Sequence, residues 1–136
     1  MVLSNLKYDS IKYLMGSRHP AWIKYQTLVK ILDRSENDPE VKLYKEKRDR
    51  SAIVRRIREK QHQDGSFLCM PWMHIHKYYF HQMLEMGFGI DDVTVKNCVE
   101  NLLLRKQQPN GSWLFCGKSS PWYTIEVLTV LGKLIQ

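Results

Sequence analysis

Apolar residues recur at helical spacing along most of this chain of 136 residues, and polar stretches separate the apolar patterns. The helical patterns cover residues 3–15, 20–32, 40–61, 72–86, 92–106 and 122–135. The third pattern has a sparse apolar face, and we expect a break near Asp49. The last is apolar almost all round, which is typical of a helix buried on more than one side. We therefore predict an all-α fold of about six to seven helices, in a single domain over residues 1–136.

Residues that favour helix starts stand in front of three of these patterns. Asp38 and Ser120 each precede a proline, which is the arrangement of an N-cap side chain before a proline at the first helical position. Asp91 or Asp92 is placed to cap the fifth helix in the same way.

Two short segments between helices share a sequence and lie 46 residues apart. They are Gln61-His62-Gln63-Asp64-Gly65-Ser66-Phe67 and Gln107-Gln108-Pro109-Asn110-Gly111-Ser112-Trp113. The Gln can hydrogen-bond backbone groups that a helix end leaves free, Asp or Asn favours a turn, and Gly accepts a positive φ. A repeat near this period is typical of stacked helical hairpins, so we interpret both turns as structural. The residues of this turn motif are Gln61, Asp64, Gly65, Phe67, Gln107, Asn110, Gly111 and Trp113.

The segment Gln107-x-x-x-Gly111-x-Trp113 resembles the Gln–Trp motif of the terpenoid cyclase and protein prenyltransferase superfamily. The earlier copy is similar, with Phe67 in place of Trp, and the chain looks like a truncated squalene-cyclase-like repeat domain. The resemblance implies an α/α toroid, a ring in which inner and outer helices alternate. At about 46 residues per repeat the chain holds roughly three units, half of a closed ring, so we expect a ring that is open or is completed by another chain.

The acidic and zinc-binding motifs of that superfamily are incomplete in this sequence. Its cyclases protonate substrates with an Asp-x-Asp-Asp motif, but Gly89 occupies the first position here, so the following Asp pair is left to cap a helix. Its prenyltransferases bind zinc through an Asp-x-Cys pair, which this sequence lacks. The remaining candidate metal ligands are His74, His76 and His81, with Cys69 as a possible extra ligand, and the histidines do not have the spacing of a helical zinc site. We predict no catalytic residue, no metal and no cofactor.

Two sets of residues are candidates for binding. An aromatic and Met stripe at helical spacing indicates either core packing or a face for an apolar ligand or an interface, and it comprises Trp72, His76, Tyr79, Met83, Trp122 and Tyr123. The stretch 41–60 carries nine Lys or Arg and three acids, and is either the solvated face of an outer helix or an anion-binding surface. The residues of that possible anion surface are Lys45, Arg48, Arg55, Arg56 and Arg58.

The cysteine count and the chain's hydropathy indicate a cytoplasmic protein. Three cysteines leave one unpaired in any disulfide scheme, so we expect free thiols in a reducing compartment. The N-terminal residues lack the apolar core of a signal peptide, and no apolar run is long enough to span a bilayer. The net charge of +7 is compatible with an acidic partner, but no nucleic-acid-binding motif accompanies it.

Three functions remain open at this stage. The chain is a non-catalytic binding or scaffold module, a small enzyme or enzyme fragment acting on an isoprenoid or other apolar substrate, or an anion-binding helical repeat. The missing acid and zinc motifs favour the first. Because the apolar last helix needs cover, we also expect a homodimer. The residues expected at or near its interface are Trp122, Tyr123, Val127, Val130 and Leu134.

Overall fold

The computed structural model describes residues 7–67, 75–100, 107–115 and 117–135, and it describes their side chains except those of 75–78, 115 and 135. The described residues contain seven α-helices, which confirms the all-α prediction. The chain divides into two compact units, Met1–Arg55 and Arg56–Gln136. The single domain expected from the sequence stays a prediction.

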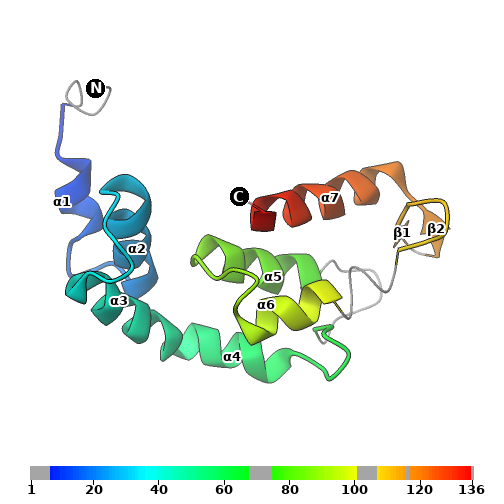
Figure 1. The fold of residues 1–136 in the computed structure, drawn as a ribbon, viewed down its shortest axis with the longest axis horizontal. Coiled ribbons are helices and arrows are strands. Elements are labelled where there is room, and N and C mark those ends of the chain that lie inside the picture. Colours follow the sequence, from blue (N-terminus) through cyan, green and yellow to red (C-terminus); the bar gives the residue numbers. More distant parts are fainter. Residues whose placement is uncertain (1–6, 68–74, 101–106, 116, 136) are drawn as a thin grey trace. The chain divides into compact units, whose positions relative to one another are not determined.

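The first unit is built on a helix pair. It contains α1 (Ser10–Leu14), α2 (Ala21–Gln26), a π-helical turn η2 (Thr27–Ile31) and α3 (Pro39–Asp49). Figure 1 shows α2 lying alongside α3. The buried side chains of this pair are apolar and come from both helices and the π turn, namely Tyr25, Leu28 and Val41, with Met15, Val29 and Tyr44 packed against them.

A buried arginine links the two helices of this pair. Arg48 is 3% exposed, and its guanidinium lies 4.5 Å from the centre of the Tyr25 ring. It also pairs with Asp49 at 2.9 Å, so the buried charge has a carboxylate partner. The Tyr25 hydroxyl donates to Glu36 at 2.7 Å. The sequence-based assignment of Arg48 to an anion surface therefore does not fit its position, because its guanidinium is packed inside the first unit.

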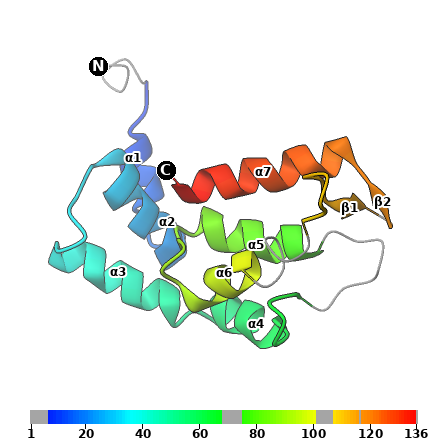
Figure 2. The same cartoon turned by 45° about the vertical axis from the view of Figure 1, so that its right-hand side comes forward.

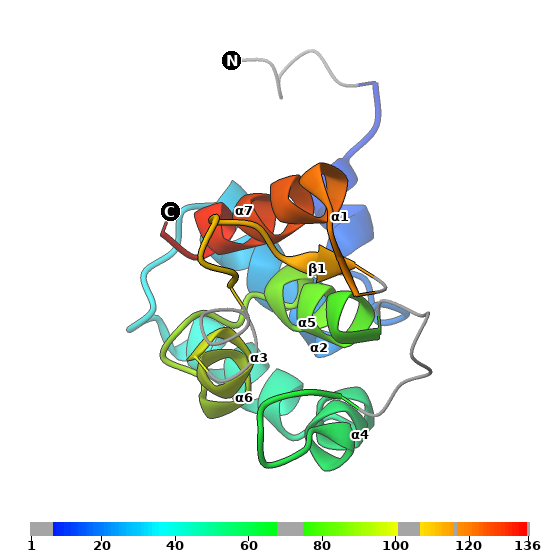
Figure 3. The same ribbon diagram turned by 90° about the vertical axis from the view of Figure 1, so that its right-hand side faces the viewer.

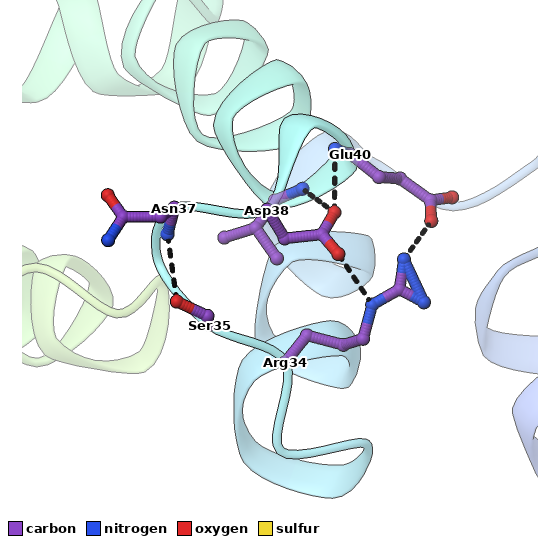
Figure 4. Close-up of polar contacts among 6 residues, drawn as sticks. Arg34, Ser35, Asn37, Asp38 and Glu40 are labelled. Carbon is purple, nitrogen blue, oxygen red and sulfur yellow. Dashed lines mark hydrogen bonds and ion pairs between the residues drawn. The ribbon is translucent and has the colours of Figure 1, made fainter.

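The predicted cap at Asp38 is confirmed. One Asp38 carboxylate oxygen accepts from the backbone N–H groups of Glu40, at 2.8 Å, and Val41, at 3.4 Å (Figure 4). The other oxygen accepts from Arg34 Nε at 3.0 Å, and the same guanidinium reaches the Glu40 carboxylate at 3.0 Å. The Glu40 N–H is the main cause of a lowered pKa at Asp38, and the Val41 N–H and Arg34 lower it further. The result is a rigid start for α3.

The helix over the basic stretch breaks where the sequence indicates. After α3 ends at Asp49, α4 begins at Ala52 and runs to Lys60. Val54 and Ile57 are buried, whereas Arg55 and Arg56 are exposed on the same helix. The charged and apolar residues of α4 therefore occupy different faces.

The second unit is a set of helices joined by the two repeated turns. It contains α5 (Ile75–Glu85), α6 (Val93–Asn97) and α7 (Pro121–Ile135). Figures 2 and 3 show α5 with α6 on one side and α7 on the other. A two-residue antiparallel pair, β1 (Leu114–Phe115) with β2 (Lys118–Ser119), precedes α7 and was not predicted. The buried apolar residues of this unit are Ile57, Phe67, Phe80, Met83, Met86, Phe88, Val95, Cys98, Val99, Trp113, Val127 and Val130.

The last helix is buried on one side only, which corrects two expectations. Val127 and Val130 are buried within the chain, so their assignment to a dimer interface is wrong. On the other side, Trp122 is 73%, Ile125 60% and Leu128 54% exposed. The composition of α7 predicted burial all round, but no described residue covers this second side. We refer to Trp122, Ile125 and Leu128 as the outer face of α7.

The buried Tyr25 predicts a loss of stability at high pH. Burial, with Glu36 beside the hydroxyl, raises the pKa of Tyr25 from 10.0 to about 12. The folded protein therefore holds this proton more tightly than the unfolded chain does, and the resulting stability is complete below pH 10 and is lost as the pH rises through about 12. Ultraviolet titration should show one late tyrosine, absent in Tyr25→Phe. Identical titration curves for the two proteins would contradict this assignment.

Candidate functional site: the repeated turns and the outer face of α7

The first turn is closed by its own side chains. The Gln61 side-chain amide donates to the Gly65 carbonyl at 3.1 Å, and the His62 N–H donates to the Ser66 carbonyl at 2.6 Å. Asp64 accepts from the Ser66 N–H at 2.9 Å and also from its hydroxyl. Gly65 has φ of +84°, which a residue with a Cβ rarely adopts. Phe67, at the end of the turn, is buried.

The second turn repeats this pattern bond for bond. The Gln107 amide donates to the Gly111 carbonyl at 3.2 Å, and the Gln108 N–H donates to the Ser112 carbonyl at 2.8 Å. Asn110 accepts from the Ser112 N–H at 3.0 Å and from its hydroxyl at 2.7 Å. Gly111 has φ of +86°, and Trp113 is buried like Phe67. The sequence repeat is therefore a structural repeat. The side-chain turns of Asp64 and Asn110 and the positive φ of the two glycines are confirmed, whereas each Gln amide binds the glycine carbonyl of its own turn and not, among the described residues, the end of the preceding helix.

The first turn also holds the start of the next repeat. The Gln61 amide donates to the Thr94 carbonyl, in the first turn of α6, at 2.9 Å. Three residues before Gln61, Arg58 pairs with Asp92 at 2.9 Å, and its guanidinium lies 5.6 Å from the centre of the Phe88 ring. Asp92, one of the two capping candidates, is the N-cap of α6. The end of α4 and its turn thus bind the N-terminus of α6 through a side-chain amide and an ion pair.

The second turn holds the start of α7 instead. The Trp113 N–H donates to the Thr124 hydroxyl at 3.1 Å, and the Ser120 N–H donates to the Trp113 carbonyl at 3.2 Å. The Ser120 hydroxyl accepts from the Tyr123 N–H at 3.2 Å, which confirms the predicted cap. Gln107 is exposed, and its amide donates only to Gly111 among the described residues.

The helices that follow the two turns differ in how they are covered. From Tyr79 to Glu85, the part of α5 with described side chains, Glu85 is the one exposed residue. Along α7, in contrast, the outer face is open to solvent. Equivalent elements of two repeats are thus covered to different extents.

The predicted apolar stripe does not form one surface. Met83 is buried, Tyr79 is half-buried with its ring centre 5.4 Å from that of Phe67, and Trp122 is exposed. Tyr123 is half-buried, while Trp72 and the side chain of His76 lie outside the described part. Sequence reasoning missed Ile125 and Leu128 as surface residues, because an all-apolar helix carries no signal for which side the fold covers.

Two residues of the predicted anion surface, Arg48 and Arg58, make contacts inside the protein. Arg48 is buried against Tyr25, and Arg58 pairs with Asp92. Lys45 is half-buried and pairs with Glu36 at 3.3 Å. Arg55 and Arg56 on α4 stay exposed.

The described residues hold no group of three His, Cys, Asp or Glu that could bind a metal ion. Cys69 and His74 lie outside the described part of the chain, as does the side chain of His76. Cys98 is a buried free thiol, and its burial raises its pKa to about 12. At neutral pH this group is a protonated thiol that packs as an apolar side chain.

No protein-family model matches this chain, and no curated protein or solved structure shows significant similarity to it. Among the helices that the structure describes, none is long and apolar enough to cross a membrane.

Gly111→Ala should lower the free energy of unfolding by about 1 kcal/mol, because a Cβ disfavours the positive φ of this residue. Chemical denaturation followed by circular dichroism gives the value. Gly132→Ala, inside α7, is the matched control. A Cβ there meets no atom within 4 Å, and alanine is the better helix former by about 1 kcal/mol, so this variant should be more stable than the unmodified protein. Equal effects at the two positions would contradict the assignment of the turn.

Gln61→Ala should cost about 1–2 kcal/mol of stability and more than Gln107→Ala, since among the described residues the first glutamine joins its turn to another helix and the second does not. The same denaturation experiment compares the two variants. If they are equally stable, the bond to Thr94 contributes nothing and the first turn does not hold α6.

Proposed function

We propose that this chain is a non-catalytic binding or scaffold module of the cytoplasm, a helical repeat of the prenyltransferase and terpenoid-cyclase type whose outer face of α7 is the binding surface. The observation that carries the proposal is the exposure of Trp122, Ile125 and Leu128 on consecutive turns of one helix. Contiguous apolar groups of this kind on a protein surface mark contacts with a partner or a ligand.

The turns support a scaffold role for the rest of the unit. The Gln, Asp or Asn, and Ser side chains of the turns make hydrogen bonds inside the turn, to the next helix, or to Ser119 before α7. These bonds hold the helix ends, and the second set fixes the start of α7 through Trp113 and Thr124. A rigid helix that presents apolar side chains loses little conformational entropy when a partner binds.

An aromatic residue at the beginning of the outer face adds to its suitability for binding. Trp122 combines a large apolar area with few rotatable bonds, and tryptophan is enriched among the residues that contribute most to interfaces. Ile125 and Leu128 extend the apolar area by one helical turn each. We expect the bound group to be apolar, because Trp122, Ile125 and Leu128 are large exposed apolar side chains.

Native mass spectrometry of gently purified protein tests this proposal. We expect a species heavier than the 16.2 kDa chain, carrying either a second polypeptide or an apolar molecule. Leu128→Glu should remove the added mass and leave the circular dichroism spectrum unchanged, because this side chain is exposed.

Ile53→Glu is the matched control, since it places the same charge at an exposed apolar position on α4. It should keep the added mass. The proposal would be overturned if the unmodified protein had the mass of a single chain, or if the added mass persisted in Leu128→Glu.

A further inference from the structure

We propose that the outer face of α7 binds the same face of a second copy of this chain, with the two α7 helices antiparallel about a two-fold axis. This inference rests on the proposed role of α7 as a binding surface and identifies its partner. Figure 2 shows α7 at the edge of the second unit, with α5 on one side. The sequence along the other side of α7 is complementary to itself when the helix is reversed.

The middle of this side can be covered without the loss of a hydrogen bond. Thr129 follows Ile125 by four residues, so it lies on the same side of the helix, and it is exposed. Its hydroxyl donates to the Ile125 carbonyl at 2.8 Å. Because this polar group already has a partner within the helix, an apolar neighbour that covers it leaves no donor unpaired.

A projecting side chain and a gap lie two helical turns apart on this side. Ile125 is 60% exposed, whereas a Cβ placed on Gly132 would meet no atom within 4 Å. In an antiparallel pair that crosses at Leu128 and Thr129, the Ile125 of each copy lies over the Gly132 of the other. The large residue of one copy therefore occupies the space beside the glycine of the other, and the two-fold axis repeats this contact.

One edge of this side carries an acid and a base at the spacing that the same pairing requires. Glu126 and Lys133 stand seven residues apart, about two turns, so they lie on the same edge of the helix. Glu126 is half-buried and Lys133 is exposed. Reversing the helix about the two-fold axis keeps this edge in place and exchanges the order of the two charges. Each Glu126 therefore lies near the Lys133 of the other copy, and opposite charges meet twice.

The same residues disfavour other arrangements on this face. A parallel pair would place Glu126 beside Glu126 and Lys133 beside Lys133, and like charges at such a contact repel. It would also leave the space beside Gly132 unfilled. An anionic lipid surface would meet the carboxylate of Glu126 at the edge of the face. The antiparallel second copy is thus the partner that matches both the shape and the charge of α7.

Sedimentation velocity of the full chain, over a series of concentrations, tests the pairing. The unmodified protein should sediment as a dimer, with twice the mass of the 16.2 kDa chain. Leu128→Glu should sediment as a monomer, because the two copies of this residue lie next to the two-fold axis and would bring two negative charges together.

Reversal of the edge charges tests the orientation. Glu126→Lys and Lys133→Glu should each raise the dissociation constant of the dimer about tenfold or more, because each turns two attractive pairs into two repulsive ones. An equimolar mixture of the two variants should regain the dissociation constant of the unmodified protein. In that mixed dimer both edge contacts again join a lysine to a glutamate.

Three controls make the same charge changes elsewhere. Lys96→Glu lies at an exposed position on α6, Glu46→Lys on α3 and Ile53→Glu on α4. All three should form dimers like the unmodified protein, and circular dichroism should show native helix content in every variant.

A monomeric unmodified protein would overturn the inference. If such a monomer carries another molecule that Leu128→Glu loses, the proposed binding function stands and only this partner is refuted. If it carries nothing, both proposals fail.

A dimer can also contradict the arrangement. One that persists in Leu128→Glu uses another surface. Charge variants that bind as tightly as the controls, or a mixture that does not regain affinity, exclude the contact between Glu126 and Lys133. A mixture that binds more tightly than the unmodified protein indicates parallel helices, because only there does mixing replace contacts between like charges.

Discussion

The side-chain amide of Gln61 donates two hydrogen bonds at the point where the second unit turns from one repeat to the next. One closes the turn on the Gly65 carbonyl, and the other reaches Thr94 at the start of α6. Both acceptors are main-chain carbonyls in a partly buried setting, and the Thr94 carbonyl also accepts from the backbone N–H of Cys98. The amide therefore couples the shape of the turn to the position of the following helix, and the rest of the second unit depends on that coupling.

The hydrogen bond that closes each turn depends on the backbone conformation of its glycine. The positive φ at Gly65 brings its carbonyl within reach of the glutamine amide, and Gly111 does the same for Gln107. Asp64 and Asn110 stabilise the same geometry by accepting two hydrogen bonds from the serine two residues later. The bulky aromatic that ends each turn then enters the core, which anchors the loop on its apolar side.

In the first unit, the helices are joined by a buried arginine and a tyrosine, whereas the second unit uses the side-chain amide of Gln61. Arg48 lies inside the helix pair, and its cost of burial is offset by the carboxylate of Asp49 and by the face of the Tyr25 ring. Tyr25 in turn binds Glu36, in the loop before α3. Helix, loop and helix are therefore joined by one chain of polar contacts next to an apolar cluster. The Asp38 cap then sets where α3 begins.

The sequence by itself determined the features that depend on neighbouring residues. The helices, the caps at Asp38 and Ser120, the break after Asp49 and the two turns could all be read from it, because each is set by interactions within a few positions. The packing of the folded chain decided the rest. The contacts of Gln61 with Thr94 and of Arg58 with Asp92 span more than 30 positions and have no local signal. The apolar composition of α7 likewise predicted burial on every side, but only the tertiary structure buried Val127 and Val130 and left Trp122, Ile125 and Leu128 exposed. The sequence of so uniformly apolar a helix does not indicate which side is buried, because that depends on the elements that pack against the helix in the folded chain.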